Sequence, residues 1–117
     1  MANSFGTDIL LQAENPHSVA VFYIEQLGFT LTGESPNMLH LEGAHINLYI
    51  ELGPALGPIL EVMVSNVAEA RQRLLANGCT LIKDEPEFPR CYIQDPQGLT
   101  YNLRAARVNP IVALRES

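Results

Sequence analysis

The sequence predicts an α+β domain built from two copies of a βαβββ unit. The order of strand-like and helix-like segments repeats after about fifty residues, the spacing of a long structural repeat. Short landmarks recur at matching places, with FTL at 29–31 and CTL at 79–81, and with GAHINL at 43–48 and GLTYNL at 98–103. One domain over 1–117 therefore contains a first module at 8–51, a linker at 52–58, a second module at 59–104 and a tail at 105–117.

In the first half, a helix is predicted over 16–27. Asn15 supplies an N-cap, Pro16 suits the first helical position, and Gly28 ends the apolar periodicity. Strands are predicted at 8–14, 29–34, 37–42 and 44–51, because these runs are rich in apolar and β-branched residues and turn residues separate them.

The second half repeats this order. Asn66 caps a helix over 67–77, Glu69 completes a capping box, and Gly78 ends the helix. Strands are predicted at 59–65, 79–84, 90–95 and 98–104. The intervening LGPALGP at 52–58 reads as a linker because Gly and Pro interrupt a strand.

Composition limits the partners. The 117 residues carry a net charge of −6 with no dense basic cluster, which disfavours nucleic acid. No apolar run approaches the roughly 20 residues that span a bilayer, and the first residues lack a basic and apolar leader, so we expect a cytoplasmic protein without membrane contact.

Strand alternation separates a helix-facing row from a mixed face. We expect Ile46, Leu48 and Ile50 to face one helix, and Leu99, Tyr101 and Leu103 the other. The opposite face mixes carboxylates and amides with apolar side chains, a combination typical of ligand pockets as well as of solvated sheets. We expect a cleft there.

Two longer stretches resemble the vicinal oxygen chelate superfamily, which includes glyoxalase I, bleomycin resistance proteins and extradiol dioxygenases. They are NPHSVAVFYIEQLGF at 15–29, similar to the family's first helix, and DPQGLTYNL at 95–103, similar to its final turn and strand. The resemblance implies a curved mixed sheet around a cleft, commonly within a homodimer.

The resemblance also implies four metal-ligand positions, which fall on Asp8, Asn47, Ile59 and Asn102. One carboxylate, two amides and an aliphatic side chain are a poor set for Zn, Ni or Fe. We therefore predict the metal-free, bleomycin-resistance-like branch, with no metal and no cofactor.

The leading hypothesis is a small-molecule-binding protein that sequesters a drug or metabolite in a dimer cleft. Its expected ligand contacts are Asp8, Asn47, Tyr49, Ile59, Glu61, Met63, Asn102 and Arg104.

Two alternatives stay open. One is a lyase, isomerase or dioxygenase-like enzyme, using either a displaced metal near His40 and His45 or a carboxylate base, Asp8 or Glu61, with Tyr49, Tyr92 or Arg90 stabilising negative charge. The other is a structural or partner-binding module, suggested by the apolar residues of the tail.

Overall fold

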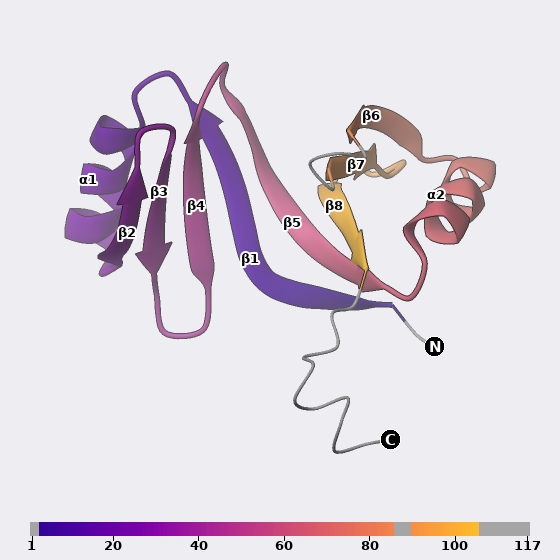
Figure 1. The fold of residues 1–117 in the computed structure, drawn as a ribbon, viewed down its shortest axis with the longest axis horizontal. Helices are drawn as coiled ribbons and strands as arrows, with labels where there is room; N and C mark the ends of the chain where they lie inside the picture. The colour runs from indigo at the N-terminus through magenta and orange to yellow at the C-terminus, as the bar shows by residue number, and fades with distance from the viewer. Residues whose placement is uncertain (1–2, 86–89, 106–117) are drawn as a thin grey trace.

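The computed structural model describes residues 3–85 and 90–105, which form one eight-stranded mixed sheet with two helices on its outer side (Figure 1). The elements in chain order are β1 (Ser4–Ala13), α1 (Pro16–Leu27), β2 (Thr30–Ser35), β3 (Met38–Glu42), β4 (Asn47–Leu52), β5 (Leu56–Val64), α2 (Val67–Ala76), β6 (Thr80–Glu85), β7 (Arg90–Gln94) and β8 (Thr100–Ala105). The predicted α+β class and the two βαβββ units are confirmed.

Both helices begin at the predicted caps. The Asn15 side chain accepts a hydrogen bond from the Ser18 backbone N–H at 3.2 Å, and Asn66 accepts one from Glu69 N–H at 3.0 Å. Gly28 ends α1 in the left-handed region, with φ of 77°. Each cap satisfies a backbone donor that the first helical turn leaves free.

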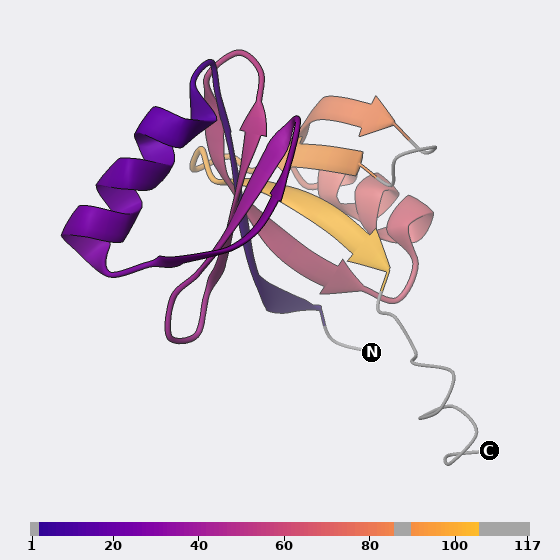
Figure 2. The same ribbon diagram turned by 60° about the vertical axis from the view of Figure 1, so that its left-hand side comes forward.

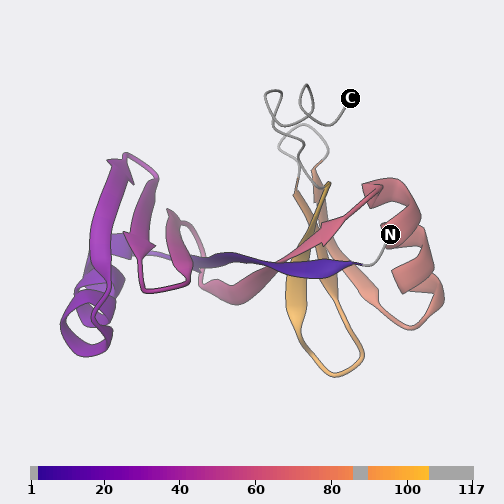
Figure 3. The ribbon, with the colours of Figure 1, turned by 90° about the horizontal axis from the view of Figure 1, so that it is seen from below.

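The strand order β2-β3-β4-β1-β5-β8-β7-β6 places one module on each side of a central antiparallel pair, β1 with β5. Within each module the first and last strands are parallel, β1 with β4 and β5 with β8. Figure 3 shows that β1 and β5 form the long connection between the modules. The repeat in the sequence therefore corresponds to a repeated pattern of strand pairing.

Each module has its own apolar core. In the first, Leu39, Leu41, Leu48 and Ile50 are buried together with Ala20 of α1. In the second, buried residues of β5, β7 and β8 pack on Ala70 of α2, namely Val62, Val64, Cys91, Ile93, Tyr101 and Leu103. The helices cover the outer faces of the two modules (Figure 2), so the inner, concave face is left for another role.

Several predicted strand limits are wrong. Strand β4 begins at Asn47, so His45 and Ile46 precede it and both are exposed; Ile46 is not part of the helix-facing row. Strand β8 begins at Thr100, and Leu99 is also exposed rather than facing the helix. In both cases the preceding residues form the turn that enters the strand. Strand β1 starts earlier than predicted, at Ser4.

The predicted linker is shorter than 52–58 because β5 already begins at Leu56. Its Gly and Pro residues are accommodated by a register shift, in which Leu10 pairs with Ile59 but Gln12 pairs with Leu56. Gly57 has φ of 114°, and a Cβ built there would lie 2.9 Å from the Leu10 carbonyl oxygen. A side chain at this position would block the pairing.

Most of the predicted tail, 106–117, lies outside the described residues. Within 3–85 and 90–105, neither helix has the length and hydropathy needed to cross a lipid bilayer.

Candidate ligand cleft

A cavity of about 370 Å³ opens on the concave face between the modules. Strands of both modules supply its walls. The lining residues are Asp8, Ile9, Leu10, Met38, Tyr49, Ile59, Leu60, Glu61, Arg90, Tyr92, Asn102 and Arg104. Both modules of one chain line this cavity, and the homodimer whose second copy completes the cleft stays a prediction.

Two buried residues lie at the wall of the cleft, beside the half-buried apolar side chains of Leu10 and Met38. Ile59 and Tyr92 are each 1% exposed, yet neither belongs to a module core. Both line the cavity together with Leu10 and Met38. A sheet that curls around a ligand-sized space shields apolar area on its concave face, whereas a flat, solvated sheet would expose that area.

The first module contributes an acid–amide pair. Asp8 and Asn47 are register partners, and the Asn47 amide nitrogen donates to Asp8 Oδ1 at 3.2 Å. The Asn47 amide oxygen lies 3.0 Å from His40 Nε2, which is therefore the donor in that contact. The His40 ring stacks on Tyr49, with centroids 4.4 Å apart and planes at 10°. This series of contacts fixes the position of the Asp8 carboxylate.

The second module places the same two residue types side by side, although no hydrogen bond joins their side chains among the described residues. Glu61 and Asn102 are register partners, and the Asn102 amide oxygen accepts from the Cys91 backbone N–H at 2.8 Å. Arg104 Nη1 donates to Glu61 Oε2 at 2.6 Å. Gly6 provides the space for this carboxylate, because a Cβ built there would overlap Glu61 Oε1.

This geometry corrects the position expected at Ile59. Counting back from the helix cap makes Ile59 the second-module counterpart of Asp8. In the sheet, however, Ile59 pairs with Thr100, and Glu61 is the partner of Asn102. The count fails because the strand continues further beyond the acidic residue in β1 than in β5. The repeat therefore yields two acid–amide pairs, Asp8 with Asn47 and Glu61 with Asn102.

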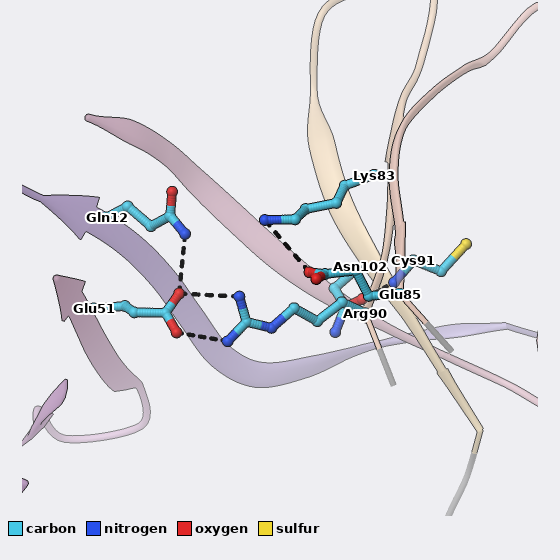
Figure 4. Close-up of polar contacts among 7 residues, drawn as sticks. All are labelled: Gln12, Glu51, Lys83, Glu85, Arg90, Cys91 and Asn102. Atoms are coloured by element: carbon cyan, nitrogen blue, oxygen red, sulfur yellow. Dashed lines mark hydrogen bonds and ion pairs between the residues drawn. The ribbon is translucent and has the colours of Figure 1, made fainter. Parts of the chain in front are cut away.

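An ion pair connects the two walls (Figure 4). Arg90 of β7 donates to both carboxylate oxygens of Glu51 of β4, at 3.2 and 2.5 Å, and the Gln12 amide donates to Glu51 Oε1 at 3.0 Å. Burial acts to raise the pKa of Glu51, but the hydrogen bonds from Arg90 and Gln12 outweigh it and the pKa is lowered.

Two phenol groups face the cavity. Burial raises the pKa of Tyr49 and of Tyr92, so both are neutral at ordinary pH. Neither hydroxyl has a hydrogen-bond partner among the described residues, and no fully buried side-chain polar atom there lacks one. A ligand in the cavity would lie beside both phenol groups, each of which can donate or accept a hydrogen bond.

The donor set does not suit Zn, Ni or Fe, because the positions Asp8, Asn47, Glu61 and Asn102 offer neither imidazole nor thiolate. The amide oxygens of Asn47 and Asn102 already accept protein hydrogen bonds, and Arg104 engages the Glu61 carboxylate. His45 lies in the exposed turn before β4, so it does not share a strand face with His40. Over the described ranges, no group of three or more His, Cys, Asp or Glu residues could hold a metal ion.

Six of the eight expected contacts line the cavity: Asp8, Tyr49, Ile59, Glu61, Asn102 and Arg104. Asn47 lies behind Asp8 and positions it. Met63 pairs with Arg104 but is not among the lining residues. Met38 was missed as a contact; its place two residues before His40 on the same strand was the available signal.

Neither a protein-family model nor a curated protein sequence matches the chain. Solved structures do. A hypothetical protein from Bacillus halodurans has a TM-score of 0.65 and 18% identity, covering 93% of this chain and 98% of its own. A glyoxalase/bleomycin resistance protein/dioxygenase superfamily member from Vibrio splendidus has a TM-score of 0.58 and 17% identity, covering 88% and 100%.

Homoprotocatechuate 2,3-dioxygenase from Brevibacterium fuscum, solved with 3,4-dihydroxyphenylacetate, has a TM-score of 0.61 and 20% identity over 98% of this chain. The alignment spans only 41% of that dioxygenase. The fold of this chain is that of the glyoxalase, bleomycin resistance protein and dioxygenase superfamily, as the sequence resemblance predicted. At these identities the likeness establishes the fold alone.

Proposed function

We propose that the chain is a small-molecule-binding protein whose site is the cleft between its modules, and that it sequesters a drug or metabolite without a metal. The observation that supports this most strongly is the mixed lining of the cavity, in which the half-buried apolar side chains of Leu10 and Met38 lie with the phenols of Tyr49 and Tyr92 and the Asp8 carboxylate. Such a surface suits an organic molecule with an apolar body and a few polar groups.

The charges favour a ligand with a cationic nitrogen. Glu61 and Glu51 are each within 2.6 Å of an arginine nitrogen, whereas among the described residues the nearest cation to Asp8 is Arg104 at 3.9 Å. Asp8 is therefore the least compensated carboxylate at the cavity. An ammonium group beside Asp8 would also lie near the Tyr49 ring, and the net charge of −6 favours its approach.

The alternative, an enzyme that uses a carboxylate base, is best supported at the same residue. Glu61 is engaged by Arg104, so Asp8 is the carboxylate available to accept a proton. Asp8→Asn would then abolish turnover of a bound compound. Bound compounds that are released unchanged from the wild type would leave sequestration as the function.

The test is a thermal-shift screen of small aromatic amines and neutral aromatics against the wild type, Tyr92→Phe and Tyr101→Phe. Both variants lose one hydroxyl on neighbouring strands, but Tyr92 lines the cavity and Tyr101 lies in the second core. We expect the rise in melting temperature caused by a ligand to shrink in Tyr92→Phe and to persist in Tyr101→Phe. Equal loss in both, or no shift with any compound, contradicts the proposal.

A further inference from the structure

Arg104 lies between two carboxylates that come from different modules. Its Nη1 atom is 2.6 Å from Glu61 Oε2 on β5 and 3.9 Å from Asp8 Oδ2 on β1. β1 and β5 are adjacent strands at the junction of the modules. Of the two arginines that line the cavity, Arg90 and Arg104, Arg104 is the one that lies near both Asp8 and Glu61.

The other oxygen atoms of the two acid–amide pairs are mostly occupied. Asp8 Oδ1 accepts from Asn47, the Asn47 oxygen accepts from His40, and the Asn102 oxygen accepts from the Cys91 backbone. The oxygens Asp8 Oδ2 and Glu61 Oε2 are directed toward the guanidinium. A metal ion could bind both carboxylates here only if it displaced the Arg104 guanidinium.

We propose that Arg104 is the resident cation of the cleft, and that its guanidinium occupies the place between Asp8 and Glu61 where a divalent ion would otherwise bind. It compensates both carboxylates, and because it lies within 2.6 Å of Glu61 and 3.9 Å of Asp8 it prevents a metal ion from binding the two together. Arginine suits this role because it stays charged at all accessible pH values. The proposal concerns metal exclusion and does not depend on which organic ligand the cleft takes.

A neutral residue at position 104 should therefore uncover a metal site. The exposed donors would be the carboxylates of Asp8 and Glu61, an all-oxygen set of the kind that Mn²⁺ and Mg²⁺ accept. Mn²⁺ is the practical probe, because the electron paramagnetic resonance signal of the free ion falls as the ion binds.

The experiment titrates Mn²⁺ into the wild type, Arg104→Ala and Arg104→Gln. We expect one site per chain in both variants, with affinity about tenfold or more above that of the wild type. Asp8→Asn in the Arg104→Ala background should return the affinity to the wild-type level. Arg71→Ala is the matched control, since Arg71 pairs with a single carboxylate, Asp84, and its loss should create no site.

Circular dichroism establishes whether each variant is folded. If Arg104→Ala folds only when Mn²⁺ is added, and not with NaCl of equal ionic strength, the metal has replaced the guanidinium and the proposal stands. Tight stoichiometric binding by the wild type overturns it. So does failure of Arg104→Ala and Arg104→Gln to bind Mn²⁺, whether they are folded or remain unfolded in its presence.

Discussion

Arg90 and Glu51 form a two-point ion pair although three strands separate β7 from β4 in the sheet. Neighbouring strands lie about 4.8 Å apart, so four steps across a flat sheet would place these strands roughly 19 Å from each other. The contact at 2.5 Å requires the sheet to curl until its two walls face one another. The ion pair therefore marks one boundary of the cleft and links the modules that form it.

Breaking this pair should destabilise the fold in a pH-dependent way. The lowered pKa of Glu51 means that its stabilising contribution is present above the unfolded pKa and is lost as pH falls through the folded pKa. We expect Glu51→Gln to cost roughly 1–3 kcal/mol at pH 7, and the difference from the wild type to shrink between about pH 5 and pH 3. Urea unfolding at several pH values measures this.

Glu85→Gln is the control for that series. Glu85 makes an ion pair with Lys83 at 3.4 Å, and both side chains are more than a third exposed. Its replacement should change the free energy of unfolding by about 1 kcal/mol or less. If the two variants behave alike, the pair between Arg90 and Glu51 does not hold the walls together.

Gly6 should be required for the ion pair on the other side of the cleft. A methyl group at position 6 would overlap Glu61 Oε1 and move this carboxylate away from Arg104. We expect Gly6→Ala to cost about 1–3 kcal/mol in chemical denaturation. Gly33→Ala, where the added Cβ has ordinary contact distances of 3.4 Å or more, should be neutral or slightly stabilising.

A double-mutant cycle identifies the cause. In a Glu61→Ala background the methyl group at position 6 meets no carboxylate, so its cost should largely disappear, with a coupling of about 0.5–3 kcal/mol. Additive costs would show that Gly6 is needed for backbone reasons alone.

Alkaline pH should weaken the second module through Tyr101. Burial, and then the contact with Cys79 at 3.7 Å, raise the pKa of Tyr101 above its ordinary value near 10. The neutral phenol thus stabilises the fold below pH 10, and the contribution falls as pH rises toward the folded pKa. We expect Tyr101→Phe to lose less stability than the wild type between about pH 10 and pH 12, by up to about 1.4 kcal/mol per pH unit. Equal slopes in both proteins would contradict this.

The sequence allowed the helices and the repeat to be predicted because their signals are local. Asn15 and Asn66 begin the helices as expected, since a cap depends only on the first turn that follows it. Alternation also placed Asn102 and Arg104 on the concave face. These features need no knowledge of long-range packing.

The cleft itself depends on register and curvature, which local patterns do not encode. Glu61, rather than Ile59, opposes Asn102 because β1 and β5 continue for different lengths beyond their acidic residues. The contact between Arg90 and Glu51 exists only because the sheet curls. Neither could be obtained by counting residues from the helix caps.

The central claim, that the cleft is the ligand site, is tested most directly by methyl NMR of protein labelled with ¹³C at the isoleucine δ1 positions. Ile59 lies in the cavity wall, and Ile24 lies on the exposed side of α1. Titration with compounds that raise the melting temperature should shift the Ile59 methyl signal and leave the Ile24 signal in place. Shifts at Ile24 with an unchanged Ile59 signal would place binding outside the cleft and contradict the account.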